Sequence, residues 1–302
     1  MTFDDVHRSA DESSEVATAL TIVVDDDHIA SYDLGGNGPP VLYAHANGFH
    51  ARCWQPVADH LPQFQNIAYD ARGHGNTPIG AGWASNDNDD WLILGNDASA
   101  VARSVVTGPH SQVIGMGHSM GGATLLMAAL AEPQLFRGLV VYEPIVMPPE
   151  LLGPATRKDN QLAKGARKRR SSFASFEDAI ANYTAKPPMN TFAAEAIEAY
   201  VRHGFAPGPD GRVHLKCAPE HEARMYEAAP GHRTWERLGE IAVPVWVLSE
   251  LARSGHPSAW AEQLAARIPN SRYIHLDHLD HFGPMQAPAE IAQMIAQAAS
   301  GF

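Results

Sequence analysis

The stretch Gly115-Met116-Gly117-His118-Ser119-Met120-Gly121-Gly122 lies between an apolar run and an Ala- and Leu-rich segment, and it contains the pattern Gly-x-Ser-x-Gly centred on Ser119. A serine in a sharp strand-to-helix turn has a strained backbone, and its neighbours must be small to avoid a clash. A helix that begins there directs its N-terminal N–H groups toward developing negative charge. The stretch therefore predicts that Ser119 is a catalytic nucleophile. The alternative is a glycine-rich turn that holds an incidental serine.

Short apolar runs alternate with helix-like segments on both sides of this stretch. The strand-like runs lie at residues 20–24, 28–32, 40–44, 66–69, 112–116, 138–142, 243–248 and 272–276. The helix-like segments lie at residues 91–106, 119–131, 257–266 and 288–299. Compact apolar strands that alternate with helices predict an α/β fold, in which a mostly parallel central sheet has helices on both faces.

The alternation stops between about Met147 and Leu238, where the sequence becomes helical, charged and poor in strands. We interpret residues 147–238 as an inserted helical cap, and residues 18–146 and 239–302 as the two parts of one core. Residues 1–17 are polar and acidic without periodicity, which predicts a flexible N-terminal tail.

Composition limits the partners and the compartment. The 302 residues contain 22 Lys and Arg against 34 Asp and Glu, so the net charge of −12 argues against nucleic acid or an anionic membrane surface as the main partner. No apolar run reaches the roughly 18 residues of a membrane span, and the N-terminus lacks the features of a signal peptide. Two distant cysteines, Cys53 and Cys217, form no disulfide framework or zinc cluster. We expect a cytoplasmic protein that acts on a small molecule.

A serine hydroxyl needs a base to become a nucleophile. Among the 16 histidines, His281 follows the last predicted strand and precedes the final helix. With this loop, the chain resembles the α/β-hydrolase superfamily over most of residues 19–300. Four motifs carry the resemblance, in the order of that family: His45-Ala46-Asn47-Gly48-Phe49, Asp70-Ala71-Arg72-Gly73-His74-Gly75, Gly117-His118-Ser119-Met120-Gly121-Gly122 and His281-Phe282-Gly283-Pro284.

The resemblance implies an α/β-hydrolase fold with a cap, and His281 as the base. The acid of the family usually follows the strand after the cap, but residues 248–254 contain no aspartate. A subset of the superfamily carries the acid after the preceding core strand, where this chain has Glu143. A carboxylate there would orient His281 and stabilise its imidazolium. The alternatives are Glu250, Asp277 or Asp280 as the acid, with Glu143 only capping its turn.

The oxyanion of an acyl-transfer reaction needs two N–H donors. One is expected to be the backbone amide of Met120, which follows the nucleophile. By resemblance the other is the amide of Asn47, and Gly48 is the alternative because Ala46 replaces the usual glycine. The motif at residues 70–75 is interpreted as structural, with Arg72 holding neighbouring turns together.

Two further clusters have competing interpretations. His275, His278 and His281, with Asp277 and Asp280 between them, approach a metal-binding pattern, but Leu276 stands where the first histidine of that pattern should be. We expect no metal and no organic cofactor. The basic residues between Lys164 and Arg170 are interpreted as a solvated helix face, with a grip for an anionic substrate as the alternative.

The sequence thus predicts a serine hydrolase that cleaves a carboxylic ester, a lactone or a similar acyl bond of a largely apolar small molecule. Ser119, His281 and Glu143 form the predicted triad, and the amides of Asn47 and Met120 form the oxyanion hole. The alternatives are a carbon–carbon bond hydrolase or a cofactor-free perhydrolase with the same triad. A non-catalytic small-molecule binder is the alternative from a different class. No feature of the sequence sets an oligomeric state.

Overall fold

The computed structural model describes residues 18–24, 27–80, 91–106, 112–151 and 160–302. The segment predicted as a flexible tail, residues 1–17, lies outside the described residues. Eight strands form the main sheet in the order β1-β2-β4-β3-β5-β6-β10-β11. Their bounds are β1 (Thr18–Val24), β2 (Asp27–Asp33), β3 (Pro40–Ala44), β4 (Gln65–Tyr69), β5 (Val113–His118), β6 (Phe136–Tyr142), β10 (Val245–Ser249) and β11 (Ser271–His275).

The sheet is mostly parallel, as predicted. The pairs from β4 through β11 are parallel, whereas β1 pairs with β2 and β2 with β4 in antiparallel fashion. Alternate residues of one strand enter different cores: Leu42 and Ala44 of β3 lie in one buried cluster, and Val41 and Tyr43 in the other. Both faces of the sheet are therefore buried, which explains why these strands read as continuous apolar runs.

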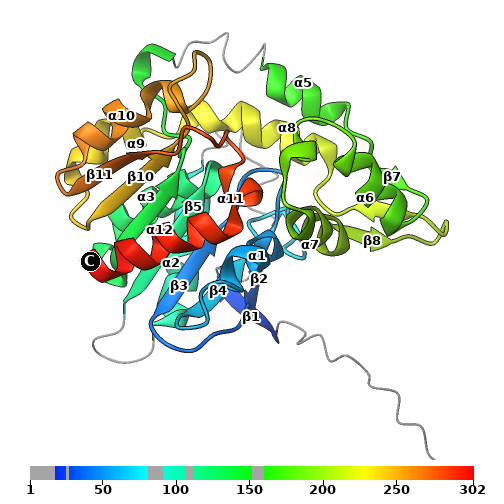
Figure 1. The fold of residues 1–302 in the computed structure, drawn as a ribbon, viewed down its shortest axis with the longest axis horizontal. Helices are drawn as coiled ribbons and strands as arrows, with labels where there is room; N and C mark the ends of the chain where they lie inside the picture. Colours follow the sequence, from blue (N-terminus) through cyan, green and yellow to red (C-terminus); the bar gives the residue numbers. More distant parts are fainter. Residues whose placement is uncertain (1–17, 25–26, 81–90, 107–111, 152–159) are drawn as a thin grey trace, which may run out of the picture.

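Helices cover both faces, which confirms the predicted α/β layers (Figure 1). The apolar side chains of α2, α3 and α10 pack into the first cluster, and those of α1 and α12 pack into the second. The α-helices are α1 (Gln55–Ala58), α2 (Leu92–Val105), α3 (Met120–Ala131), α5 (Gln161–Arg167), α6 (Phe176–Thr184), α7 (Ala194–Gly204), α8 (Pro219–Ala228), α9 (Thr234–Arg237), α10 (Ser258–Arg267), α11 (Gly283–Gln286) and α12 (Pro288–Gly301). Short 3₁₀ helices lie at Ala51–Trp54, Pro133–Leu135, Pro149–Leu151, Met189–Thr191, Ala229–Gly231 and Leu238–Glu240. Within the described ranges, no helix combines the length and the apolar character that crossing a lipid bilayer requires.

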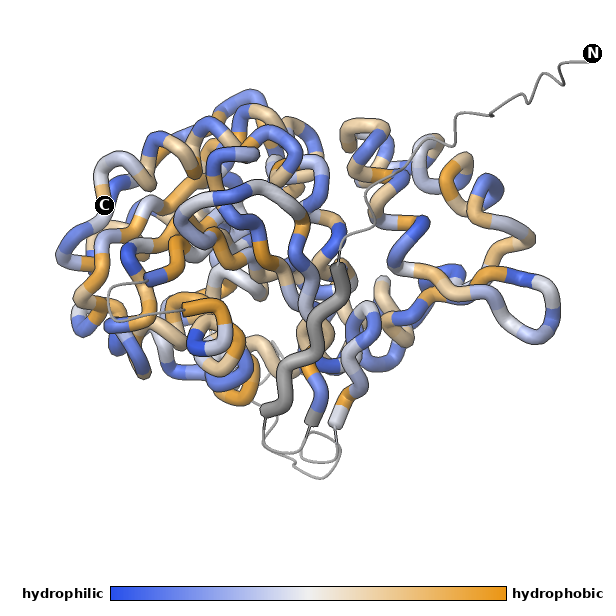
Figure 2. Tube along the Cα trace, turned by 90° about the horizontal axis from the view of Figure 1, so that it is seen from below, coloured by the Kyte–Doolittle hydropathy of each residue, from blue (hydrophilic) through white to orange (hydrophobic). Residues whose placement is uncertain are grey.

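The segment between β6 and β10 contains α5 to α9, and most of it lies to one side of the main sheet (Figures 1 and 2). It also contains a small antiparallel sheet in the order β7-β9-β8, made of β7 (Ser172–Phe173), β8 (Phe205–Pro207) and β9 (Val213–Leu215). The sequence pattern predicts helices in this segment, and this small sheet was not predicted. Strands of two or three residues are too short to show an alternating pattern.

Arg72 and Asp97 form a buried ion pair that joins a loop of the core to α2. The Arg72 Nε atom donates to Asp97 Oδ2 at 2.7 Å and an Nη atom donates to Oδ1 at 2.9 Å. Their side chains are 2% and 1% exposed. The backbone carbonyl of Arg72 also accepts from His74 Nδ1 and from His221 Nε2 of α8, both at 2.9 Å. Arg72 therefore holds neighbouring turns together, as the sequence analysis interpreted it.

Buried histidines connect the residues around the main sheet with α7 and α8. The rings of His45 and His74 lie 5.1 Å apart, and the rings of His74 and His221 lie 5.3 Å apart. The Nε2 atom of His50 lies 3.1 Å from the carbonyl of Tyr200. Burial lowers the pKa of His45, lowers that of His50 to about 3, and lowers that of His74 well below 6.5. These three imidazoles are therefore neutral in the folded protein at neutral pH.

Replacing Asp97 with Ala is expected to destabilise the protein by about 3–5 kcal/mol, because it removes the carboxylate that makes two hydrogen bonds to the buried Arg72 guanidinium. The measurement is the free energy of unfolding in urea. The matched control is Glu240→Ala in the Arg237–Glu240 pair, whose side chains are 52% and 58% exposed. The control should cost no more than about 1 kcal/mol. Equal losses for the two variants would contradict the structural role of the buried pair.

The buried histidines predict that stability falls as the pH drops below about 6.5. Their pKa values are lowered in the folded protein, so the unfolded chain binds more protons in acid. Each such histidine contributes up to about 1.4 kcal/mol per pH unit between its unfolded and folded pKa values. The melting temperature, measured from pH 7.5 to 4.5, should decline steadily. The slope should be smaller for His50→Gln and unchanged for the exposed control His60→Gln. A flat profile would contradict this prediction.

Candidate active site

Ser119 occupies a strained turn between β5 and α3. Its backbone angles are φ 56° and ψ −114°, in a region that non-glycine residues rarely adopt. A Cβ atom on Gly117 would come within 2.6 Å of the Gly121 carbonyl oxygen, and one on Gly121 would overlap the carbonyl of Ala44. The sharp turn therefore needs both glycines, as the spacing of the motif predicted.

The structure brings the three predicted triad residues together at the carboxyl ends of the strands. The Ser119 Oγ atom lies 3.3 Å from His281 Nε2, and His281 Nδ1 donates to Glu143 Oε2 at 2.6 Å. Glu143 is fully buried, Ser119 is buried, and the His281 side chain is 19% exposed. A hydroxyl, an imidazole and a carboxylate thus form a hydrogen-bonded series, which is the arrangement in which a base and an orienting group can activate a nucleophile.

Glu143 follows β6 directly, with φ 44°. Its second oxygen, Oε1, accepts from the backbone N–H of Glu250 at 2.9 Å. The Glu250 carboxylate does not contact His281 in this way, since one of its oxygens lies 3.4 Å from the Ser258 hydroxyl. Burial and the nearby Glu143 carboxylate raise the pKa of Glu250. The residue after β10 therefore supports Glu143 through its backbone, while the Glu143 carboxylate faces His281.

The two aspartates considered as alternative acids have other surroundings. Asp280 accepts from the backbone N–H of Phe282 at 2.7 Å and thereby shapes the loop. Asp277 is 72% exposed beside His278, and His278 Nε2 lies 2.7 Å from Glu290.

Two side chains that the sequence analysis did not assign hold the loop that carries His281. His118 Nε2 donates to the backbone carbonyl of His281 at 2.7 Å, and the Tyr142 hydroxyl donates to the carbonyl of Asp280 at 2.6 Å. Burial lowers the pKa of His118 well below 6.5, and the proximity of His281 adds to this effect. His118 is thus a neutral donor. The position of His118 directly before Ser119 in the Gly-x-Ser-x-Gly motif is the feature of the sequence that could have pointed to it.

Residues 45–49 follow β3 and are named here the oxyanion loop, because they contain Asn47, the predicted oxyanion donor. The Gly48 N–H donates to His74 Nε2 at 3.1 Å, since the lowered pKa of His74 keeps this nitrogen free to accept. The amide of Gly48 is therefore engaged, and the Asn47 amide becomes the better candidate donor. The Asn47 side chain donates to the backbone carbonyl of Glu222 in α8 at 2.9 Å. Met120 begins α3, so its amide lies in the first helical turn.

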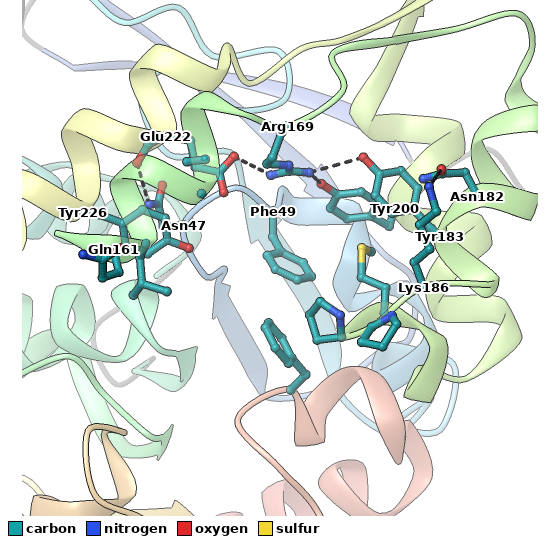
Figure 3. A pocket seen from close by; sticks show the side chains of 17 residues that line it. Asn47, Phe49, Gln161, Arg169, Asn182, Tyr183, Lys186, Tyr200, Glu222 and Tyr226 are labelled. Atoms are coloured by element: carbon teal, nitrogen blue, oxygen red, sulfur yellow. Dashed lines mark hydrogen bonds and ion pairs between the residues drawn. The ribbon is translucent and has the colours of Figure 1, made fainter.

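A cavity of about 410 Å³ lies beside these residues, between the oxyanion loop and the segment from α5 to α8 (Figure 3). One part of its wall is polar, because Arg169 lies between Glu222 and the hydroxyls of Tyr183 and Tyr200. The rest is mainly apolar and includes Phe49, Leu162, Pro187, Pro188, Met189 and Phe282. Trp54 does not line this cavity, because it is buried in the core against Tyr43.

The basic run from Lys164 to Arg170 has neighbouring carboxylates. Arg167 pairs with Glu220 and Glu227 on the exposed side of α5. Arg170 pairs with Asp178, and Arg169 faces the cavity and pairs with Glu222. These pairs support the solvated-face interpretation for the exposed arginines. Arg169 lines the cavity, and Glu222 balances its charge.

Neither a metal centre nor a reactive thiol emerges in the described part of the chain. Its histidines, cysteines and carboxylates form no group of three or more that could hold a metal ion. Cys53 and Cys217 are free and buried, and burial raises the pKa of both thiols.

Two relatives align with part of the chain. The chain is 34% identical to lipase LipV from Mycobacterium tuberculosis over 122 residues, which are 40% of this chain and 42% of that protein. It is 30% identical to 2-(acetamidomethylene)succinate hydrolase from Mesorhizobium japonicum over 110 residues, 36% of each chain. The aligned part thus spans less than half of either relative.

The fold has close counterparts among solved structures. A crystal structure of E-2-(acetamidomethylene)succinate hydrolase superposes with a TM-score of 0.77 at 20% identity, and the match covers 93% of this chain and 98% of that one. The family model described as "Alpha/beta hydrolase family" matches residues 41–294. The chain therefore belongs to the alpha/beta hydrolase family.

Proposed function

We propose that this protein is a serine hydrolase that cleaves a carboxylic ester, a lactone or a similar acyl bond of a small molecule. The observation that carries the proposal is the continuous hydrogen-bonded series from Ser119 through His281 to buried Glu143. The residue after His281, Phe282, lines the cavity. Both aligned relatives carry the names of hydrolytic enzymes, which supports the same class of reaction.

In the proposed mechanism, Ser119 Oγ attacks the substrate carbonyl while His281 Nε2 takes the serine proton. Glu143, bonded to Nδ1, holds the imidazole in this tautomer and stabilises the imidazolium. The backbone amides of Met120 and Asn47 stabilise the oxyanion of the tetrahedral intermediate. His281 then donates the proton to the leaving group. Finally, a water molecule activated by His281 releases the acyl group from Ser119.

The cavity supports a largely apolar substrate. Its volume of about 410 Å³ lies within the range typical of small-molecule sites. The ring of Phe282 lies 5.4 Å from that of His281 and 6.1 Å from that of Phe49, and both phenylalanines line the cavity. Met189 extends the apolar wall into the opposite segment. We propose that residues 147–238 act as a cap over the site, and that residues 18–146 and 239–302 form the catalytic core.

The test is hydrolysis of p-nitrophenyl esters, from acetyl to palmitoyl, by the wild type and triad variants. Ser119→Ala and His281→Ala should each lower kcat by about 10⁶-fold, because nucleophile and base act as a unit. Glu143→Gln should lower kcat by about 10⁴-fold, because the imidazole loses its orienting carboxylate. Melting temperatures of all variants establish that they are folded.

The matched control is Glu250→Gln, which keeps the backbone N–H that binds Glu143 and should change kcat by less than about threefold. Full activity of Glu143→Gln, with loss in Glu250→Gln, would overturn the assignment of the acid. A folded wild type without activity on any ester would overturn ester hydrolysis, and would direct the search to carbon–carbon cleavage, perhydrolysis or binding without catalysis.

A further inference from the structure

We propose that Glu222, Arg169 and Tyr200 form a cap-borne relay that positions the oxyanion loop, so that an ion pair outside the triad sets the rate of the chemical step. The inference rests on the proposed function, and it names three positioning residues that do not touch the reacting atoms. All three line the cavity, and they come from three separate segments of the cap.

The relay reaches the oxyanion loop through the Tyr200 hydroxyl. This hydroxyl lies 3.2 Å from the backbone carbonyl of Gly48 and also accepts from the Arg169 guanidinium. Arginine has donors but no acceptor, so the single hydroxyl proton is directed to the Gly48 carbonyl. The Arg169 cation therefore determines which way this hydrogen bond points.

Glu222 contacts both Arg169 and the oxyanion loop. Its carboxylate forms the ion pair with Arg169, and its backbone carbonyl accepts from the Asn47 side chain at 2.9 Å. Gly48, with φ 77°, packs directly on this pair: a Cβ there would lie 2.7 Å from a Glu222 oxygen and 3.1 Å from an Arg169 nitrogen. Only glycine leaves the loop room to approach so closely.

Burial makes the relay sensitive to the loss of any member. The side chains of Glu222 and Arg169 are 6% and 21% exposed, and Tyr200 is 2% exposed. A buried charge or hydroxyl that loses its partner is costly, so the network is stable only when it is complete. Removing one member allows the oxyanion loop to shift.

The backbone N–H of Asn47 is held in place from two directions. The Asn47 side chain is bonded to α8, and the next residue, Gly48, is bonded to Tyr200 through its carbonyl and to His74 through its amide. An oxyanion donor acts only at the correct distance from the developing charge, and a misplacement of about 1 Å can cost about 100-fold in rate. A shift of this loop should therefore lower kcat and leave substrate binding largely intact.

The decisive comparison is Tyr200→Phe against Tyr183→Phe. Both remove one hydroxyl that accepts from the same Arg169 nitrogen atom and lines the same cavity, but the Tyr200 hydroxyl is the one bonded to Gly48. With the preferred p-nitrophenyl ester, Tyr200→Phe should lower kcat by about 10- to 100-fold, with KM within about twofold. Tyr183→Phe also changes the cavity wall but keeps the bond from Tyr200 to Gly48, so it should lower kcat by a clearly smaller factor than Tyr200→Phe, and any larger change should fall on KM.

A second readout is inhibition by a trifluoromethyl ketone, which forms a tetrahedral oxyanion adduct with an active-site serine. Its inhibition constant should rise in Tyr200→Phe by the same factor by which kcat/KM falls, because both depend on oxyanion stabilisation. Arg169→Met should resemble Tyr200→Phe, while Arg169→Lys should restore part of kcat by keeping a cation beside Tyr200. The arginine pair keeps the test decisive if Tyr200→Phe does not fold.

Equal effects of the two tyrosine variants, or a loss confined to KM, would overturn the relay. Failure of the proposed function has a different signature: the wild type itself would turn over no ester and bind no trifluoromethyl ketone. That result would overturn the relay as well, but it would already be visible in the wild type, without any variant of the cap.

Discussion

The buried carboxylate of Glu143 is the constraint on which the rest of the site depends. A carboxylate with no exposed surface is stable only when its oxygens are hydrogen-bonded. One oxygen binds His281, and the other binds the backbone N–H of Glu250. These two bonds tie the end of β6 to the end of β10 and to the loop after β11. The need to satisfy a buried charge therefore holds the imidazole of His281 within reach of the Ser119 hydroxyl.

Backbone strain concentrates at the same place. Among the described residues, Ser119 and Glu143 are the non-glycine residues with positive φ. Both residues directly follow parallel strands that are neighbours in the sheet. The backbone N–H of Ser119 donates to the backbone carbonyl of Tyr142, and that of Glu143 donates to the backbone carbonyl of Leu248. These hydrogen bonds to the next strand hold both residues in their strained backbone conformations. The sheet edge thus holds Ser119 and Glu143, while a loop holds His281.

The oxyanion loop depends on different supports. Its Gly48 backbone is bonded to His74 and to Tyr200 of α7, and the Asn47 side chain is bonded to the backbone of α8. Residues around the main sheet thus hold Ser119, His281 and Glu143, whereas the oxyanion loop is also held by residues of the segment from α5 to α8. The buried ion pair of Arg169 and Glu222 adjoins this loop at Gly48.

Local patterns in the sequence were sufficient to predict the strand–helix alternation, the turn at Ser119, and the places of His281 and Glu143 at the ends of predicted strands. Such features depend on periodicity and on neighbours close in sequence. Only the tertiary structure decided that Glu250 binds Glu143 through its backbone, that Gly48 is engaged by His74, and that Arg169 meets Glu222 and Tyr200. These contacts join segments far apart in the chain, and no local periodicity encodes which distant side chains will share one buried space.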